Sequence, residues 1–267
     1  MMNTGKLTYI IRKTGLMHLF DYLKFVFQWL KNYPANRKFK KEHPGVALPP
    51  AYLVYESFRM NYEKYYEGGL ATARWLVDHL KEFSLPAGAC ILDWGCGPAR
   101  IIRHLPALLS GASCCGCDYN PRTIEWCRKN IPEVSFSLNN LNPPLPYAAS
   151  TFDVIYGISV FTHLSEQNHA RWYRELIRIA KPGGLLFFTT HGEAYKAILT
   201  NAERRDFDRG RLIIRSGVKE GHRVFAAFHP PVFMKNLFES QAVILKHIPG
   251  KPCSWGIDQD VWILRKK

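Results

Sequence analysis

A short segment between residues 91 and 100 combines an acidic residue with two closely spaced glycines. It reads Ile-Leu-Asp-Trp-Gly-Cys-Gly-Pro-Ala-Arg, and its first residues continue an apolar run. Glycine lets the backbone turn sharply and come close to a ligand. We therefore expect a strand that ends in a ligand-binding turn. The expected contact residues of this turn are Asp93, Trp94, Gly95, Cys96 and Gly97.

A second acidic residue, Asp118, stands twenty-one positions after Gly97, where another apolar run ends. In folds of alternating strands and helices, ligands bind at the carboxyl ends of the strands. An acidic side chain at such a position can accept hydrogen bonds from both hydroxyls of a ribose. The pattern therefore predicts a ligand that contains a nucleoside, and it leaves open whether this is a nicotinamide dinucleotide or S-adenosylmethionine.

Three features favour S-adenosylmethionine. A dinucleotide turn carries a third glycine so that the pyrophosphate can reach the helix amino terminus, and Arg100 occupies that position here. Asp93 would repel a phosphate, whereas it suits the amino group of a methionine moiety. The Lys-Pro-Gly-Gly turn at residues 181–184 is typical of methyltransferases. An NAD-dependent oxidoreductase is thus the weaker alternative.

Residues 86–190 together resemble the class I S-adenosylmethionine-dependent methyltransferases, and in particular their small-molecule branch of types 11 and 25. Residues 93–97 resemble the first motif of that family, with Ala99 in place of a common third glycine, and Asp118 matches its ribose-binding acid. Further segments similar to the small-molecule branch are residues 143–147, 152–156 and 159–164.

The resemblance implies methyl transfer from S-adenosylmethionine to an oxygen or nitrogen atom of a small-molecule acceptor, without a metal ion. It also implies further contacts to the cofactor. Besides the glycine turn and Asp118, the residues implied are Tyr119, Asn139, Asn140, Leu141 and Ser159.

Three histidines are candidates for a general base, because an unperturbed imidazole titrates near neutral pH. They are His163, His191 and His229. A dedicated base is not required, since methyl transfer from a sulfonium depends mainly on alignment and desolvation of the nucleophile. The candidates for contact with the acceptor are Tyr62, Tyr65, Tyr66 and Phe161.

The elements that must position these residues alternate between strands and helices. Such units imply parallel strands joined by right-handed crossovers. We expect an α/β protein with a doubly wound, Rossmann-like, mostly parallel sheet, the class I methyltransferase fold, and an N-terminal helical extension. Strands are expected at 89–94, 113–118, 134–138, 152–158, 185–190, 212–216, 224–228, 243–247 and 261–265, and helices at 99–109, 122–130, 169–180 and 231–239.

Three regions are expected along the chain. Residues 1–50 form a basic helical extension, with a linker from Asn32 to Pro50. Residues 51–85 form a helical lid or cap that is broken near Gly68 and Gly69. Residues 86–267 form the methyltransferase domain, in which 191–260 contribute elements of the acceptor site.

The early helix places polar residues on one stripe of an otherwise apolar surface. The residues of this stripe are His18, Asp21, Lys24, Gln28 and Lys31. The apolar surface has to be covered, and we expect it to pack on the protein itself. Peripheral contact with a membrane through residues 16–31 is the alternative.

The formal net charge of +14 is carried by the flanks of the chain. Residues 51–195 hold 13 basic and 13 acidic side chains, whereas residues 1–50 and 196–267 carry +7 each. The basic flanks leave a non-catalytic RNA-binding protein as a further alternative, although we do not expect nucleic acid as partner. Seven cysteines, an odd number in mostly apolar runs, indicate a reduced, cytoplasmic protein without a zinc site.

Overall fold

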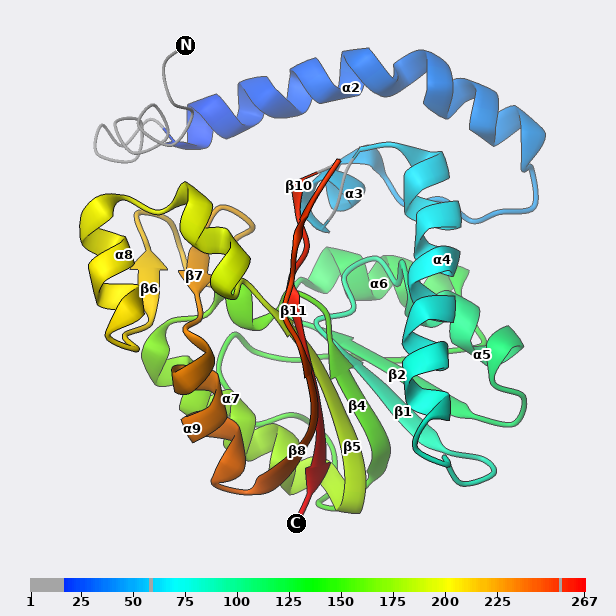
Figure 1. Ribbon diagram of the computed structural model, residues 1–267. Helices are drawn as coiled ribbons and strands as arrows, with labels where there is room; N and C mark the ends of the chain where they lie inside the picture. The colour runs from blue at the N-terminus through cyan, green and yellow to red at the C-terminus, as the bar shows by residue number, and fades with distance from the viewer. Residues whose placement is uncertain (1–16, 58–59, 255) are drawn as a thin grey trace. The chain divides into compact units, whose positions relative to one another are not determined.

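The computed structural model describes residues 17–57, 60–254 and 256–267. The chain divides into two compact units. Figure 1 labels the helices and strands along the chain. Among the described residues, we call the part from Met17 to Leu138 the N-terminal unit and the part from Asn139 to Lys267 the C-terminal unit.

The N-terminal unit contains three parallel strands in the order β3-β2-β1. Ile91 and Leu92 in β1 are fully buried, as expected for a parallel strand covered on both faces. Asn120 caps the following helix by accepting from the amides of Arg122 and Thr123. The elements are α2 (Met17–Glu42), α3 (Ala51–Ser57), α4 (Tyr62–Lys81), β1 (Cys90–Trp94), η1 (Ile102–His104), α5 (Leu105–Leu108), β2 (Ser113–Asp118), α6 (Pro121–Asn130) and β3 (Ser135–Leu138).

The main sheet of the C-terminal unit, as far as it is described, has the strand order β4-β5-β11-β8. The first two are parallel, and β11 is antiparallel to both of its neighbours. Buried aromatic side chains, among them Phe188, Phe238 and Trp262, fill the core between this sheet and its helices. The elements of this layer are β4 (Phe152–Gly157), η2 (Phe161–His163), α7 (Glu166–Ile179), β5 (Ala180–Thr190), α9 (Pro231–Glu239), β8 (Ala242–Ile248) and β11 (Asp260–Lys266).

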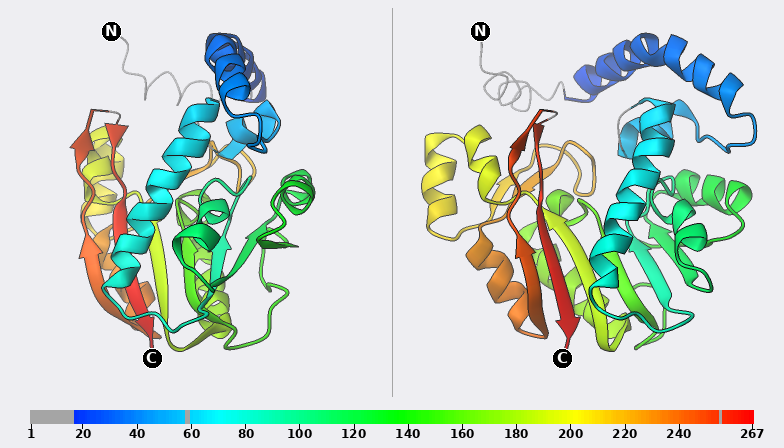
Figure 2. Two further views of the ribbon diagram at one scale, coloured as in Figure 1. Left: turned by 90° about the vertical axis from the view of Figure 1, so that its right-hand side faces the viewer. Right: turned by 45° about the vertical axis from the view of Figure 1, so that its right-hand side comes forward.

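Smaller elements complete the C-terminal unit, and Figure 2 shows them from two further sides. A capping box of Thr200 and Glu203 starts α8, and Phe207 of this helix joins a small core with Ile213 and Phe228. The elements are η3 (Glu193–Ile198), α8 (Asn201–Asp208), β6 (Ile213–Arg215), β7 (Ala226–Phe228), β9 (Pro252–Cys253) and β10 (Gly256–Ile257).

The predicted fold class is confirmed, with parallel strands joined by helices and an N-terminal helical extension. The predicted break at Gly68 and Gly69 is wrong, because α4 runs through both residues without interruption. A Cβ atom on Gly69 would lie 2.2 Å from the carbonyl oxygen of Arg100. The glycine therefore permits a close approach instead of ending the helix.

The linker is shorter than predicted, because α2 continues through Pro34 to Glu42. Contacts with α4 hold this second half: Asn36 accepts a hydrogen bond from the Tyr62 amide, and Phe39 packs in a buried cluster. The helix predicted at 99–109 is also shorter, since only η1 and α5 form there.

The turn predicted at residues 181–184 lies inside β5 as a bulge. Phe152 pairs with Ala180 and Val154 with Leu185, so the intervening residues leave the ladder, and Gly183 adopts a φ of +74°.

The apolar surface of α2 is not packed on the protein as expected. Within the described part of the chain, most of its large apolar side chains between Leu19 and Tyr33 are exposed. The side chain of His18, on the predicted polar stripe, lies outside the described residues. No helix among the described residues is both long and apolar enough to cross a membrane.

Candidate active site

The glycine turn after β1 is folded against the end of β2. The amides of Gly95 and Cys96 both donate to the carbonyl oxygen of Cys117, at 2.9 and 3.0 Å. Gly95 and Gly97 have φ angles of +74° and +50°, in the left-handed region that favours glycine. A Cβ atom on Gly97 would lie 3.1 Å from Cβ of Ser57. The two predicted glycines therefore meet a real conformational requirement.

Asp118 joins this turn to the start of α6. Its Oδ2 accepts from the amide of Gly97 at 3.0 Å, and its Oδ1 accepts from the amide of Asn120 at 2.8 Å. Burial raises the pKa of Asp118, and the two amide donors partly offset this effect. The acid at the end of β2 and the glycine turn, separated by twenty-one residues, are thus in direct contact, and their binding of a cofactor stays a prediction.

The other predicted residues of this turn differ in exposure. Asp93, Trp94 and Cys96 are buried, so the side chains of Trp94 and Cys96 belong to the core. Burial raises the pKa of the Cys96 thiol well above its usual range. Tyr119 is 41% exposed and could contact a ligand directly.

Two tyrosines of α4, Tyr62 and Tyr65, are buried and hydrogen-bonded to main-chain carbonyl groups, unlike residues of a mobile lid. The hydroxyl of Tyr65 donates to the carbonyl oxygen of Pro98 at 2.5 Å, and Arg103 Nη1 donates to this hydroxyl at 3.1 Å. Tyr65 is fully buried, and Tyr62 is buried with its hydroxyl bonded to the Pro49 carbonyl. Tyr65 therefore anchors the residue that follows the glycine turn, a role that its sequence position did not indicate.

Tyr66, the third tyrosine, packs between Phe39 and His104, with the Arg103 guanidinium 5.1 Å from its ring centroid. It is partly buried. Contact with an acceptor thus stays a prediction for all three tyrosines.

The segment that follows β3 opens the C-terminal unit. Asn139 donates from Nδ2 to the carbonyl oxygen of Asn140 at 2.7 Å, while its buried Oδ1 has no hydrogen-bond partner among the described residues. The carbonyl oxygen of Leu141 accepts from the indole of Trp172 at 3.0 Å. A buried acceptor without a partner is costly, and a ligand donor would satisfy it.

Ser159, after β4, is held by side chains that the sequence did not single out. It adopts a φ of +65°, and its amide donates to Thr189 Oγ1 at 2.8 Å. Gln259 Nε2 donates to Ser159 Oγ at 2.6 Å, and Thr189 Oγ1 donates to Gln259 Oε1 at 2.5 Å. A non-glycine residue in this backbone region persists only when its surroundings hold it. Gln259, one hundred residues away, could not have been found from local pattern.

Two of the candidate histidines contact carbonyl groups in β7 or directly before it. His163 Nδ1 lies 2.8 Å from the carbonyl oxygen of Phe225, and His191 Nδ1 lies 3.0 Å from that of Ala227. A carbonyl can only accept, so each Nδ1 carries the proton and each neutral ring keeps a lone pair on Nε2. Burial lowers the pKa of His163, and it lowers the pKa of His191 to about 3.

The third candidate, His229, is paired with His169, a residue that the sequence analysis did not name. Their Nε2 atoms lie 3.0 Å apart, and His169 Nδ1 donates to the Ser165 carbonyl at 2.7 Å. His169 therefore accepts at Nε2, and His229 must donate from its own Nε2. Burial lowers the pKa of His229 well below its usual range, and that of His169 to about 4.

Phe161 is fully buried among aromatic rings. It packs edge-on against Phe188 and Phe238 and stacks on His169 at a centroid distance of 5.3 Å. Phe161 therefore belongs to the core of the C-terminal unit, and its contact with an acceptor stays a prediction.

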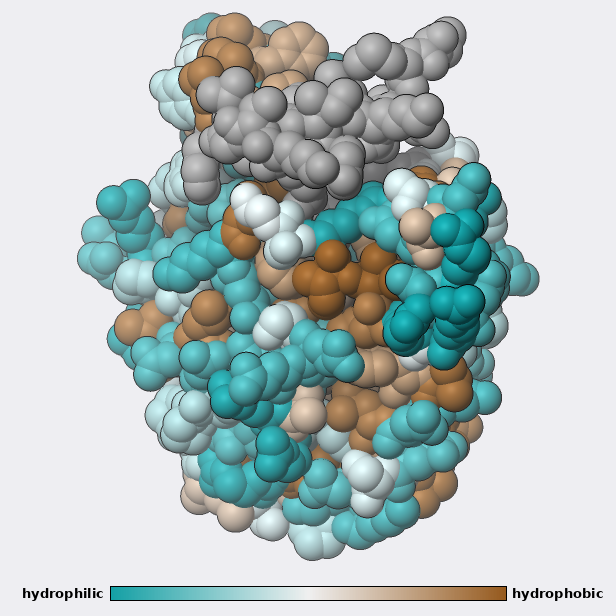
Figure 3. Space-filling view, turned by 90° about the vertical axis from the view of Figure 1, so that its left-hand side faces the viewer, coloured by the Kyte–Doolittle hydropathy of each residue, from teal (hydrophilic) through white to brown (hydrophobic). Residues whose placement is uncertain are grey.

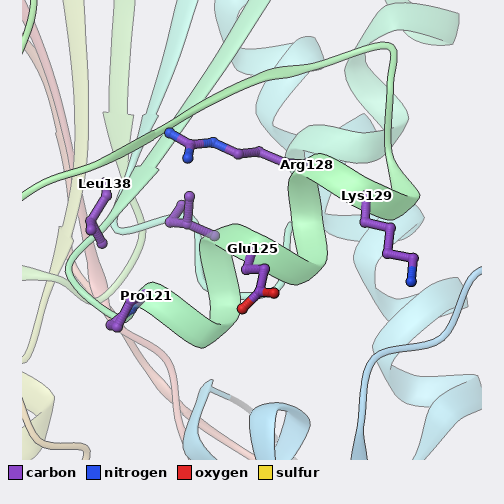
Figure 4. A pocket seen from close by; sticks show the side chains of 6 residues that line it. Pro121, Glu125, Arg128, Lys129 and Leu138 are labelled. Atoms are coloured by element: carbon purple, nitrogen blue, oxygen red, sulfur yellow. The ribbon is translucent and has the colours of Figure 1, made fainter.

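A separate, open hollow lies along α6. Figure 4 shows its lining, which includes the end of β3. Arg128 there donates from Nε to the Phe136 carbonyl at 2.9 Å. The lining residues are Pro121, Ile124, Glu125, Arg128, Lys129 and Leu138, none of which the sequence analysis named. Within the described residues, no group of three His, Cys, Asp or Glu side chains is arranged to hold a metal ion.

Comparison with known proteins identifies the type of domain that this site resembles. Residues 91–184 match the family model of a methyltransferase domain. The chain is 35% identical over 107 residues to a tRNA (carboxymethyluridine(34)-5-O)-methyltransferase of Arabidopsis thaliana, covering 40% of this chain and 25% of the relative. It is 26% identical over 172 residues to phthiotriol/phenolphthiotriol dimycocerosates methyltransferase 1 of Mycobacterium ulcerans, covering 59% and 60%. The chain thus spans less than two thirds of these relatives.

Solved structures share the fold over most of their length. A SAM-dependent methyltransferase from Methanosarcina mazei superposes with a TM-score of 0.56 at 19% identity, covering 70% of this chain and 96% of that one. A 1,6-didemethyltoxoflavin-N1-methyltransferase from Burkholderia thailandensis, with bound S-adenosylhomocysteine, gives a TM-score of 0.54 at 15% identity, covering 75% and 79%. These likenesses support the fold and leave the acceptor open.

Proposed function

We propose, because this chain belongs to the class I S-adenosylmethionine-dependent methyltransferase family, that it moves a methyl group from S-adenosylmethionine to an oxygen or nitrogen of a small molecule. The family prediction is confirmed by the match over residues 91–184. The observation that carries the proposal is the hydrogen bond between Asp118 Oδ2 and the Gly97 amide, which unites the two predicted ligand-binding features.

The residues present fit the cofactor of this family. Asp118 accepts from the amides of Gly97, Asn120 and Tyr119, and a carboxylate has about four acceptor positions, so it can still accept from a ribose hydroxyl. Gly95 and Gly97 leave the turn against Asp118 without side chains, so a ligand can approach its backbone. When bound, S-adenosylmethionine supplies a methyl group on a positively charged sulfur.

Among the three histidines, His163 is best suited to take a proton from the acceptor. Its Nδ1–H is committed to the Phe225 carbonyl, and the lowered pKa keeps the Nε2 lone pair available at neutral pH. The pKa of His191, about 3, makes that ring a weak base, and His229 uses its Nε2 proton to bind His169. If a base operates, we expect a His163→Gln variant to lose about 100-fold in the transfer rate.

Small-molecule acceptors are supported by the names of several relatives. These include a trans-aconitate 2-methyltransferase of Methylobacterium radiotolerans, 30% identical over 107 residues, and the mycobacterial enzyme above. The sequence alternative of an NAD-dependent oxidoreductase is overturned by the family match.

A tRNA acceptor is the second candidate, because the Arabidopsis relative carries that activity in its name and both flanks of this chain are basic. Transfer of labelled methyl to bulk tRNA, weakened steeply by salt, would favour it over a small molecule.

Calorimetry with S-adenosylmethionine tests the proposal. We expect the wild-type chain to bind, and Asp118→Asn to bind at least about tenfold more weakly, since hydrogen bonds to a charged group contribute about 1.5–3 kcal/mol each. Asp78→Asn is the matched control, because this carboxylate on α4 is 70% exposed. Absence of binding by the wild type, or equal binding by Asp118→Asn, would refute the proposed function.

A further inference from the structure

Helix α2 packs on the rest of the N-terminal unit through a stripe rich in polar side chains. The hydroxyl of Tyr55 lies 2.9 Å from both Oδ1 and the carbonyl oxygen of Asp21. Near the other end, Asn36 Oδ1 accepts from the Tyr62 amide at 2.8 Å. The polar residues on this stripe, all half-buried or buried, are Asp21, Gln28, Asn32 and Asn36. Hydrogen bonds therefore hold the polar side of the helix toward the protein.

The opposite side of α2 is apolar and faces outward. At 100° per residue, the exposed apolar side chains between residues 19 and 33 cover about half of the helix circumference without a charged residue among them. Figure 3 shows apolar side chains of α2 at the top of the view. We call this surface the apolar arc. It consists of Leu19, Phe20, Tyr22, Leu23, Phe27, Trp29, Leu30 and Tyr33, which are between 41% and 63% exposed.

A contiguous surface of this kind is unusual on a protein that stays alone in water, because soluble monomers rarely expose large apolar patches. An amphipathic helix normally buries its apolar side. In α2 the inward side carries the polar stripe together with Phe25 and Phe39, and the apolar arc lies outside. The hydrogen bonds of Asp21 and Asn36 fix that orientation, so the helix cannot bury the apolar arc by rolling without losing them.

The charges around the apolar arc indicate what covers it. Lys24 and Lys31 are exposed and border one edge of the arc. The whole helix carries six basic and two acidic residues, a net charge of +4. A second copy of this chain would oppose two helices of the same charge, whereas an anionic surface would attract them.

Aromatic side chains make up more than half of the apolar arc. Tryptophan and tyrosine favour the boundary between lipid headgroups and hydrocarbon, where their polar atoms stay hydrated. We propose that the apolar arc of α2 docks on the surface of an anionic lipid membrane. The helix lies along the surface, and its apolar stretch of 15 residues is about 22 Å long. The proposal does not depend on which acceptor is methylated.

Flotation of the full chain with vesicles tests this docking. Vesicles of phosphatidylcholine mixed with phosphatidylglycerol are expected to float the wild-type protein, and a Leu23→Glu, Leu30→Glu variant is expected to bind at least about tenfold more weakly. A Val232→Glu, Val243→Glu variant is the matched control. Both valines are 51% exposed, and neither belongs to the apolar arc, so this variant should float like the wild type.

A second pair of variants measures the electrostatic contribution. Lys24→Ala with Lys31→Ala should weaken binding to anionic vesicles about tenfold, and pure phosphatidylcholine should bind the wild type more weakly than the anionic mixture. Higher salt should act in the same direction. Circular dichroism establishes that each variant is folded, and Leu23→Ser with Leu30→Ser replaces the glutamate variant if that one is not.

Three results would overturn the proposal. The first is absence of flotation by the wild type with anionic vesicles, and the second is equal flotation of the wild type and the leucine variant. The third is a wild-type dimer and a monomeric leucine variant in light scattering, with no vesicle binding by either protein. The apolar arc would then be an interface between two copies of the protein.

Discussion

Gly68 and Gly69 are neighbours in α4, yet alanine at the two positions is expected to change stability in opposite directions. At Gly68 no heavy atom lies within 4 Å of an added Cβ, so alanine should only reduce the freedom of the unfolded chain. The expected gain is about 0.5–1 kcal/mol in the free energy of unfolding. For a domain of this size that raises Tm by about 1–4 °C.

At Gly69 the added Cβ would lie 2.2 Å from the Arg100 carbonyl oxygen and 3.2 Å from its carbonyl carbon. Both are main-chain atoms, so no side-chain rotation can relieve the overlap. Overpacking of this kind costs about 3 kcal/mol, and the better helix propensity of alanine offsets about 1 kcal/mol. The net loss of about 2 kcal/mol should lower Tm by about 4–8 °C.

The two variants also separate stability from ligand binding. Arg100 lies three residues after Gly97. A displaced α4 should therefore disturb the glycine turn and weaken binding of S-adenosylmethionine by Gly69→Ala, whereas Gly68→Ala should bind normally. Thermal unfolding and calorimetry on the same preparations measure both effects. Equal Tm values for the two variants would refute the reasoning, because they would show that the contact with Arg100 does not constrain the helix.

Three further outcomes are expected. Tyr65→Phe, which leaves the buried Pro98 carbonyl without its donor, should lose about 1–3 kcal/mol in urea unfolding and bind S-adenosylmethionine more weakly. The lowered pKa of His169, about 4, means that the unfolded chain binds more protons below pH 6.5, so stability should fall as pH drops from 6.5 to 4. In His169→Gln this pH dependence should be shallower by up to about 1.4 kcal/mol per pH unit; an unchanged slope would argue against a neutral buried ring. Gln259→Ala should lower methyl transfer by freeing Ser159, and an unaltered rate would show that this hold is dispensable.

The sequence by itself determined the parts of this protein that depend on neighbouring residues. An apolar run followed by Asp93 and two glycines predicts a strand and a tight turn, because strand formation and positive φ angles are local properties. Asp118 was found in the same way, since it ends the next strand of a repeating unit. Family resemblance then added the cofactor.

Only the tertiary structure decided which contacts join distant segments. From the sequence, Gly69 is read as a helix breaker, whereas in the structure it allows the Arg100 carbonyl to approach α4 closely. The hydrogen bond from Gln259 to Ser159 joins residues one hundred positions apart. The same applies to α2, whose sequence shows an apolar surface and a polar stripe. Hydrogen bonds to the Tyr55 hydroxyl and to the Tyr62 amide decide which of these two sides of α2 is turned toward the protein. The spacing of apolar residues in the sequence shows that a helix forms and where its apolar side lies. The orientation of that helix on the protein is set by the free energy of its contacts with the rest of the chain.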